Sequence, residues 1–77
     1  MITKTILLNT IVDVKDFVNT VARYDFDVDL VSGRYHIDGK SIMGIFSLDL
    51  SKPIELNIHA TDKLDEILEA LNPYVVE

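Results

Sequence analysis

The chain has 77 residues, of which 48% are hydrophobic, and its formal net charge at pH 7 is −6. This length accommodates one domain over residues 1–77, and the hydrophobic content favours a folded core. The negative charge argues against direct contact with nucleic acid or an anionic membrane, and the lack of cysteine excludes disulfides and thiolate metal sites. No stretch has the ~20 apolar residues of a membrane span and no signal-peptide pattern opens the chain, so we expect a cytoplasmic protein.

The first third of the chain predicts a strand followed by a helix. Residues Ile2 to Leu8 place apolar side chains on alternate positions of one face, which is typical of a strand. Apolar residues then recur at helical spacing from Thr10 to Tyr24, and the hydroxyl of Thr10 can cap the first turn. Asp13, three residues later, completes a pattern that resembles a capping box.

The middle of the chain predicts a β-hairpin. Residues 27–31 alternate between polar and apolar positions, and a turn with Gly33 at its first central position follows. Glycine at that position favours a type II′ turn, which pairs Ser32 with Tyr35 and places Leu30 opposite Ile37 on the buried face.

The remainder predicts a short helix, a strand and a final helix. The short helix runs from Ser41 to about Asp49, and residues 54–60 alternate as a strand. Thr61 or Asp62 is expected to cap the last helix, which Pro73 ends. The element order β-α-β-β-α-β-α, with strands that each bury one face, predicts an α+β open-faced β-sandwich with an antiparallel sheet and the helices on one side.

Ser41 is the residue on which a functional interpretation depends. It stands at the entrance of the short apolar helix, directly after Lys40. A serine there can cap the helix, and the same place favours a phosphate, which Lys40 would attract and Asp38 would repel. The residues alone leave both interpretations open.

The element order and the length resemble those of the HPr family, the phosphocarrier proteins of the bacterial sugar phosphotransferase system. The segment Lys40–Leu48, with the sequence KSIMGIFSL, closely resembles the family's regulatory-serine motif. The resemblance implies a four-stranded sheet in the order 1-4-2-3 and a protein that is not an enzyme and needs no cofactor. It implies phosphorylation of Ser41 by HPr kinase/phosphorylase, and a surface that binds this kinase, other proteins or a transcriptional regulator through Ile42, Met43, Phe46 and Leu48.

The family's other signature is a phosphorylated histidine at the start of the first helix, followed by alanine, arginine and proline. Counted back from Ser41 without gaps, the histidine position falls on Thr10, the arginine on Val12 and the proline on Asp13. Threonine has no imidazole nitrogen to carry a phosphoryl group, and Asp13 would repel one. In lacking this histidine the chain is similar to Crh, a relative within the family.

The two histidines, His36 and His59, are expected on the open face of the sheet, together with carboxylates of the strand between theirs. Imidazoles and carboxylates can ligate a metal ion, but a solvated acidic face is the interpretation that the residues favour, and we assign no metal ligand.

We therefore expect a non-catalytic HPr-like regulatory or adaptor protein that is switched at Ser41. One alternative is a genuine phosphocarrier that uses a non-standard residue such as His36 or His59. Another is a structural interaction module or homodimer, with residues 43–46 or the tail Tyr74–Val76 as its interface.

Overall fold

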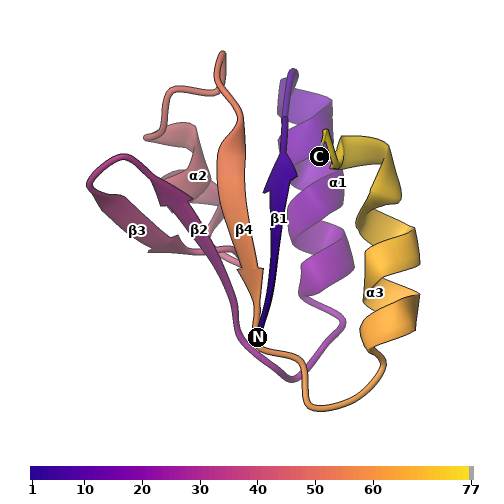
Figure 1. Ribbon diagram of the computed structural model, residues 1–77. Helices are drawn as coiled ribbons and strands as arrows, with labels where there is room; N and C mark the ends of the chain where they lie inside the picture. Colours follow the sequence, from indigo (N-terminus) through magenta and orange to yellow (C-terminus); the bar gives the residue numbers. More distant parts are fainter. Residues whose placement is uncertain (77) are drawn as a thin grey trace.

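The computed structural model describes residues 1–76. Its elements follow the predicted order (Figure 1): β1 (Ile2–Ile6), α1 (Ile11–Val21), β2 (Val28–Ser32), β3 (Tyr35–Asp38), α2 (Ile42–Phe46), β4 (Ile54–Ile58) and α3 (Leu64–Leu71), with a 3₁₀ turn at Asn72–Tyr74. The four strands form one antiparallel sheet in the order β1-β4-β2-β3. The predicted α+β class and the strand order implied by the resemblance are both confirmed.

The β2–β3 hairpin has the register that the turn predicts. Leu30 pairs with Ile37, and Ser32 pairs with Tyr35. Gly33 has φ +60°, whereas Arg34 is not among the residues with positive φ. A positive φ at the first central residue alone is the property of a type II′ turn, since type I′ needs it at both.

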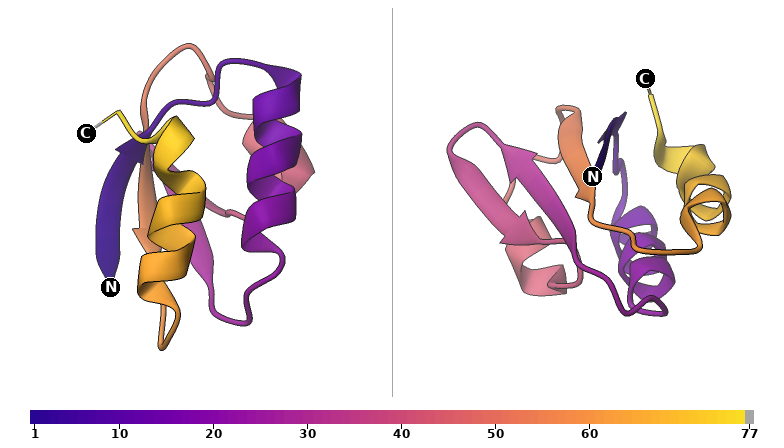
Figure 2. Two further views of the ribbon diagram at one scale, coloured as in Figure 1. Left: turned by 90° about the vertical axis from the view of Figure 1, so that its right-hand side faces the viewer. Right: turned by 60° about the horizontal axis from the view of Figure 1, so that its bottom comes forward.

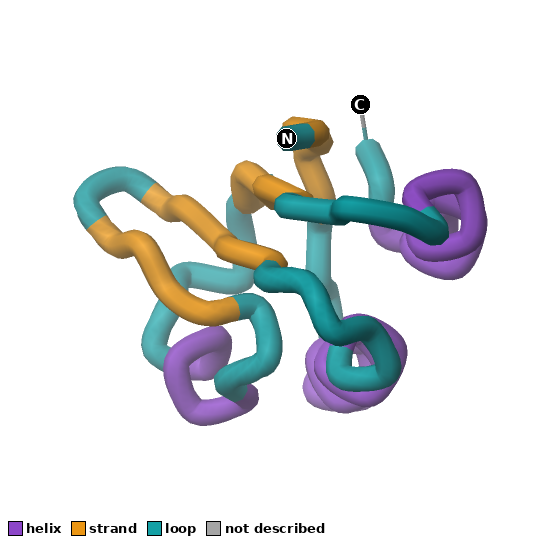
Figure 3. Tube along the Cα trace, turned by 90° about the horizontal axis from the view of Figure 1, so that it is seen from below, coloured by secondary structure: helices purple, strands orange, loops and turns teal. Residues whose placement is uncertain are grey.

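The three helices pack on one side of the twisted sheet, and the other face is open to solvent (Figures 2 and 3). α1 and α2 lie next to each other in this layer, and α3 lies on the far side of α1. Among residues 1–76, the core between the layers contains fifteen buried hydrophobic residues: Ile6, Leu8, Val14, Phe17, Val21, Phe26, Val28, Leu30, Ile45, Leu48, Ile54, Leu56, Ile58, Ile67 and Leu71.

The two edge strands of the sheet, β1 and β3, are protected from pairing with other chains in different ways. The Leu7 amide donates to the Tyr74 carbonyl at 2.9 Å and the Val76 amide donates to the Thr5 carbonyl at 2.9 Å, so the C-terminal segment covers the end of β1. The opposite edge is β3, which has only four residues. A covered edge and a short edge both limit pairing with other chains.

β1, α1 and β4 end two or three residues earlier than predicted, at Ile6, Val21 and Ile58. Two further predictions, for the end of α2 and the cap of α3, are wrong. α2 ends at Phe46 rather than near Asp49, because the chain turns away towards β4 after Ser47. Neither Thr61 nor Asp62 caps α3, because Lys63 occupies the cap position with φ +57° and gives the helix no side-chain hydrogen bond. In the part of the chain that is described, no helix is long and apolar enough to cross a membrane.

Candidate functional site

Ser41 is the N-cap of α2, as predicted. Its backbone is extended, with φ −97° and ψ 101°, and its Oγ accepts a hydrogen bond from the Gly44 amide at 3.2 Å. The Ser41 carbonyl accepts from the Ile45 amide at 3.0 Å. The side chain is half-buried, so the hydroxyl both holds the first turn of the helix and reaches the surface.

Gly44 leaves little space beside this hydroxyl. A Cβ added at Gly44 would lie 3.1 Å from Ser41 Oγ. A side chain at position 44 would therefore need the cap to shift by a few tenths of an ångström, although Asp13 occupies the equivalent position of the Thr10 cap. The glycine costs the helix about 1 kcal/mol relative to alanine.

The ammonium of Lys40 forms its hydrogen bond with Tyr24 and not with Ser41. Its Nζ donates to the carbonyl oxygen of Tyr24 at 2.7 Å and ties the start of α2 to the end of the α1 region. On the other side, the Asp38 carboxylate accepts from the Lys40 amide at 2.9 Å, and the Asp38 carbonyl accepts from the Ser41 amide at 3.0 Å. Lys40 thus acts first as a structural brace, a role that its place in the sequence did not indicate.

The residues expected to form a partner-binding surface differ widely in exposure. Met43 is 77% exposed and Phe46 is 39% exposed, while Ile42 is half-buried against the core. Leu48 is only 7% exposed, so its assignment to this surface is wrong. The turn after α2 directs the Leu48 side chain into the hydrophobic core. The surface that α2 offers is therefore Met43 and Phe46, with Ile42 at its border.

Two further apolar side chains are exposed on the neighbouring helix. Ile11 and Val12, in the first turn of α1, are each 63% exposed. α1 packs beside α2 in the helical layer (Figure 3). Sequence reasoning missed this exposed pair, although two adjacent apolar residues just before the buried stripe of α1 are a signal that could have found it.

The start of α1 is a helix cap. Thr10 has extended backbone, with φ −131° and ψ 165°, and its Oγ1 accepts from the Asp13 amide at 3.1 Å. The Asp13 carboxylate accepts in return from the Asn9 amide at 3.1 Å, which completes the predicted reciprocal cap one residue earlier than in a standard capping box. Neither of the chain's two histidines lies here.

Both histidines converge instead on one carboxylate of the open sheet face. His59 Nε2 lies 2.8 Å and His36 Nε2 lies 3.3 Å from Oδ2 of Asp29. Burial raises the pKa of Asp29, but the hydrogen bonds and charges of the two imidazoles outweigh burial and hold that pKa below its usual value. Within residues 1–76, no three histidine or acidic side chains are arranged to hold a metal ion.

Comparisons with known proteins agree with this fold. A family model described as "PTS HPr component phosphorylation site" matches residues 14–76, so the match begins after Thr10. No curated protein matches the chain.

Several solved structures are similar over nearly the whole chain, and three of them illustrate the range. HPr-C-His from Thermoanaerobacter tengcongensis has 25% identity and a TM-score of 0.78, covering 95% of this chain and 89% of its own. The phosphocarrier protein HPr from Bacillus anthracis has 25% identity and a TM-score of 0.68, covering 96% and 95%. Crh of Bacillus subtilis, described as a catabolite-repression protein and a domain-swapped dimer, has 26% identity and a TM-score of 0.62, covering 96% and 88%.

The family match spans most of the chain, and the element order, sheet order and helical layer are those of its structural neighbours. The chain therefore belongs to the HPr family of the phosphotransferase system.

Proposed function

We propose that this HPr-family protein is a regulatory or adaptor protein that does not carry phosphate on a histidine and that is switched by phosphorylation of Ser41. The observation that supports this proposal most directly is the contrast between the two helix starts. At α1 the cap is Thr10, with Asp13 beside it and no imidazole. At α2 the cap is the half-buried Ser41, and the short helix that it caps carries an exposed methionine and phenylalanine.

Phosphohistidine transfer needs an imidazole nitrogen as nucleophile and cationic or N–H groups that hold the phosphoryl group. At the start of α1 the one charged side chain that bonds the backbone is the Asp13 carboxylate, which repels a phosphoryl group. His36 and His59 face the open side of the sheet and are bonded to Asp29. These contacts argue against phosphate transfer through the start of α1, through His36 or through His59.

A phosphate on Ser41 would add about −1.5 to −2 charges at pH 7. It would lie at the start of α2, where the Gly44 amide already donates to the Ser41 side chain, two residues before the exposed Met43. Modification at this place changes the charge beside Met43 and Phe46 without touching the buried Ile45. A partner that binds the neighbouring apolar surface would then distinguish phosphorylated from unphosphorylated Ser41.

Two phosphorylation reactions test the proposal. With phosphoenolpyruvate and the first enzyme of the phosphotransferase system, we expect no acid-labile phosphate on the protein. With ATP and HPr kinase/phosphorylase, we expect one acid-stable phosphate, located at Ser41 by mass spectrometry. Ser41→Asn is the matched control, because asparagine caps a helix about as well as serine and has no hydroxyl to modify.

The alternatives give different products. An acid-labile phosphate on His36 or His59 would make the protein a phosphocarrier with a displaced site, and the proposal would be wrong. The absence of phosphate in both reactions would leave an interaction module, and sedimentation equilibrium would then decide whether its partner is a second copy. In either case Met43→Ala tests the role of this exposed side chain. If Met43 contacts a partner, the variant loses binding and keeps its stability.

A further inference from the structure

One cationic side chain of this protein is held in place by a hydrogen bond, and it belongs to the neighbour of Ser41. Of the lysine and arginine side chains among residues 1–76, that of Lys40 is the one that donates a hydrogen bond within the protein. Its Nζ lies 2.7 Å from the carbonyl oxygen of Tyr24, and Lys40 is half-buried. The bond joins the start of α2 to the segment that follows α1, sixteen residues earlier in the chain.

The acceptor of this bond is a neutral group. Both ion pairs among residues 1–76 belong to Asp29, so no carboxylate oxygen of this part of the chain lies within 4.0 Å of Lys40 Nζ. The carboxylate of the nearby Asp38 accepts instead from the backbone amide of Lys40. A carbonyl lacks the Coulomb attraction that a charged acceptor adds to a hydrogen bond with an ammonium. An anion within reach of Lys40 would therefore compete with the Tyr24 carbonyl.

Phosphorylation of Ser41 would place such an anion on the next residue. A phosphoserine carries about −1.5 to −2 charges at pH 7 and three acceptor oxygens. Consecutive Cα atoms are ~3.8 Å apart, and the four-carbon stem of a lysine is flexible. The ammonium of Lys40 can therefore exchange the Tyr24 carbonyl for the phosphate by a rotation of its own side chain.

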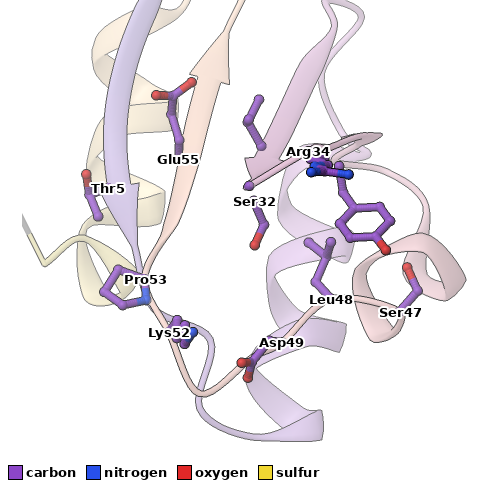
Figure 4. Close-up of a pocket in the computed structure, with 12 residues that line it drawn as sticks. Thr5, Ser32, Arg34, Ser47, Leu48, Asp49, Lys52, Pro53 and Glu55 are labelled. Carbon is purple, nitrogen blue, oxygen red and sulfur yellow. The ribbon is translucent and has the colours of Figure 1, made fainter.

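Two other cations lie at the far end of α2. Arg34 and Lys52 line the groove at the tip of the β2–β3 hairpin, together with Ser47, which directly follows α2 (Figure 4). Ser41 precedes the helix, so these two side chains and the modified hydroxyl stand at opposite ends of it. We therefore assign the response to Lys40.

We propose that Lys40 changes its hydrogen-bond partner when Ser41 is phosphorylated: its ammonium binds the Tyr24 carbonyl in the unmodified protein and the phosphate in the modified one. This inference rests on the proposed phosphorylation of Ser41. The exchange releases the start of α2 from the segment after α1, where the ring of Tyr24 packs against that of Phe26 at a centroid distance of 5.3 Å. Modification then acts at two places, on the surface beside Ser41 and on the contact between α2 and this segment.

The test uses the full chain with phosphoserine incorporated at position 41 during synthesis, so that no kinase is needed. NMR of the ¹³C,¹⁵N-labelled protein follows the Tyr24 carbonyl carbon and the Asp25 amide, which belong to the same peptide unit. Lys40→Met removes the ammonium and shows the two signals of an unbonded Tyr24 carbonyl. We expect phosphorylation to move both signals of the parent protein towards these positions and to leave them unmoved in Lys40→Met. Lys15→Met, at an exposed position of α1, is the matched control and should respond like the parent.

The ³¹P signal of the phosphoserine gives a second measurement. A nearby ammonium favours the doubly charged phosphate, so the midpoint of its pH titration should be higher in Lys40→Met than in the parent or in Lys15→Met. The proposal is overturned if phosphorylation leaves the Tyr24 and Asp25 signals of the parent in place, or if Lys40→Met and Lys15→Met give the same ³¹P midpoint. A failure of HPr kinase/phosphorylase to modify Ser41 would instead contradict the proposed function, and the two failures are thus distinguishable.

Discussion

The contact of both histidines with one carboxylate gives a prediction for Asp29→Asn. Asparagine has the same shape but no charge, so the substitution removes two charge-assisted contacts, at 2.8 Å with His59 and 3.3 Å with His36. It also relieves the repulsion between Asp29 and Asp38, which are directly paired across β2 and β3. The two effects oppose each other, and their difference decides whether Asp29→Asn raises or lowers the stability of the protein.

Exposed pairs contribute about 0.2–1 kcal/mol each, and the imidazoles are largely exposed. Like charges directly opposite on a sheet cost a similar amount for one pair. Two favourable contacts against one unfavourable pair leave a net loss of roughly 0.2–1 kcal/mol, which lowers Tm by about 1–8 °C in a domain of this size. The lowered pKa of Asp29 supports the same sign, because it means that the surroundings favour the carboxylate.

The pH dependence provides the control. A carboxyl group whose pKa is lowered by folding stabilises the protein above its unfolded pKa of about 3.8 and loses that contribution as the pH falls through the folded value. Thermal unfolding followed by circular dichroism should therefore show the difference between the two proteins at pH 7 and its disappearance in strong acid. Asp38→Asn, which keeps an acceptor for the Lys40 amide, should be neutral or slightly stabilising. Equal stability of Asp29→Asn and the parent at pH 7 would refute the reasoning.

Four further substitutions follow from single contacts. Gly39→Ala places a Cβ 2.8 Å from the Val28 carbonyl oxygen and should lower the free energy of unfolding in urea by about 1–3 kcal/mol; an unchanged midpoint would contradict the close approach. Lys63→Gly removes the cost of a left-handed lysine and should leave the protein about 1 kcal/mol more stable than Lys63→Ala in the same assay. Ser41→Ala should cost about 1 kcal/mol by loss of the cap while Ser41→Asn costs little; equal losses would show that the cap is not the cause. Met43→Ala, at an exposed position, should change stability by less than about 0.5 kcal/mol, and a larger loss in thermal unfolding would mean that Met43 is packed.

The hairpin could be predicted from the sequence in full because its information is local. Alternation determines which face of each strand is buried, and Gly33 determines the turn, so the register between Leu30 and Ile37 follows from adjacent residues. The histidine-bearing face was predicted for the same reason. The convergence of His36 and His59 on a single oxygen of Asp29 depends on side-chain rotamers and was beyond that reasoning.

The errors occurred where tertiary packing overrides local pattern. Leu48 continues an apolar series after α2, yet the turn at Ser47 sends it into the core. Lysine has no preference for positive φ, so nothing in the sequence indicated that Lys63 would start α3 in a left-handed conformation. Lys40 was expected to attract a phosphate, but its long stem reaches the Tyr24 carbonyl of a segment sixteen residues away in the chain.

The two helix caps show how stability and function can be separated in this fold. Thr10 bonds the Asp13 amide and Ser41 bonds the Gly44 amide, and each cap stabilises its helix by about 1 kcal/mol. At Thr10 the capping bond and its reciprocal bond from Asn9 to Asp13 account for the local geometry, and no chemistry has to be invoked. At Ser41 the cap accounts for the hydroxyl but not for the exposed Met43 and Phe46 beside it, because an apolar surface left in water contributes nothing to folding. This unexplained exposure is the reason to test Ser41 for a role beyond its cap, and Ser41→Asn is the variant that keeps the cap while it removes that role.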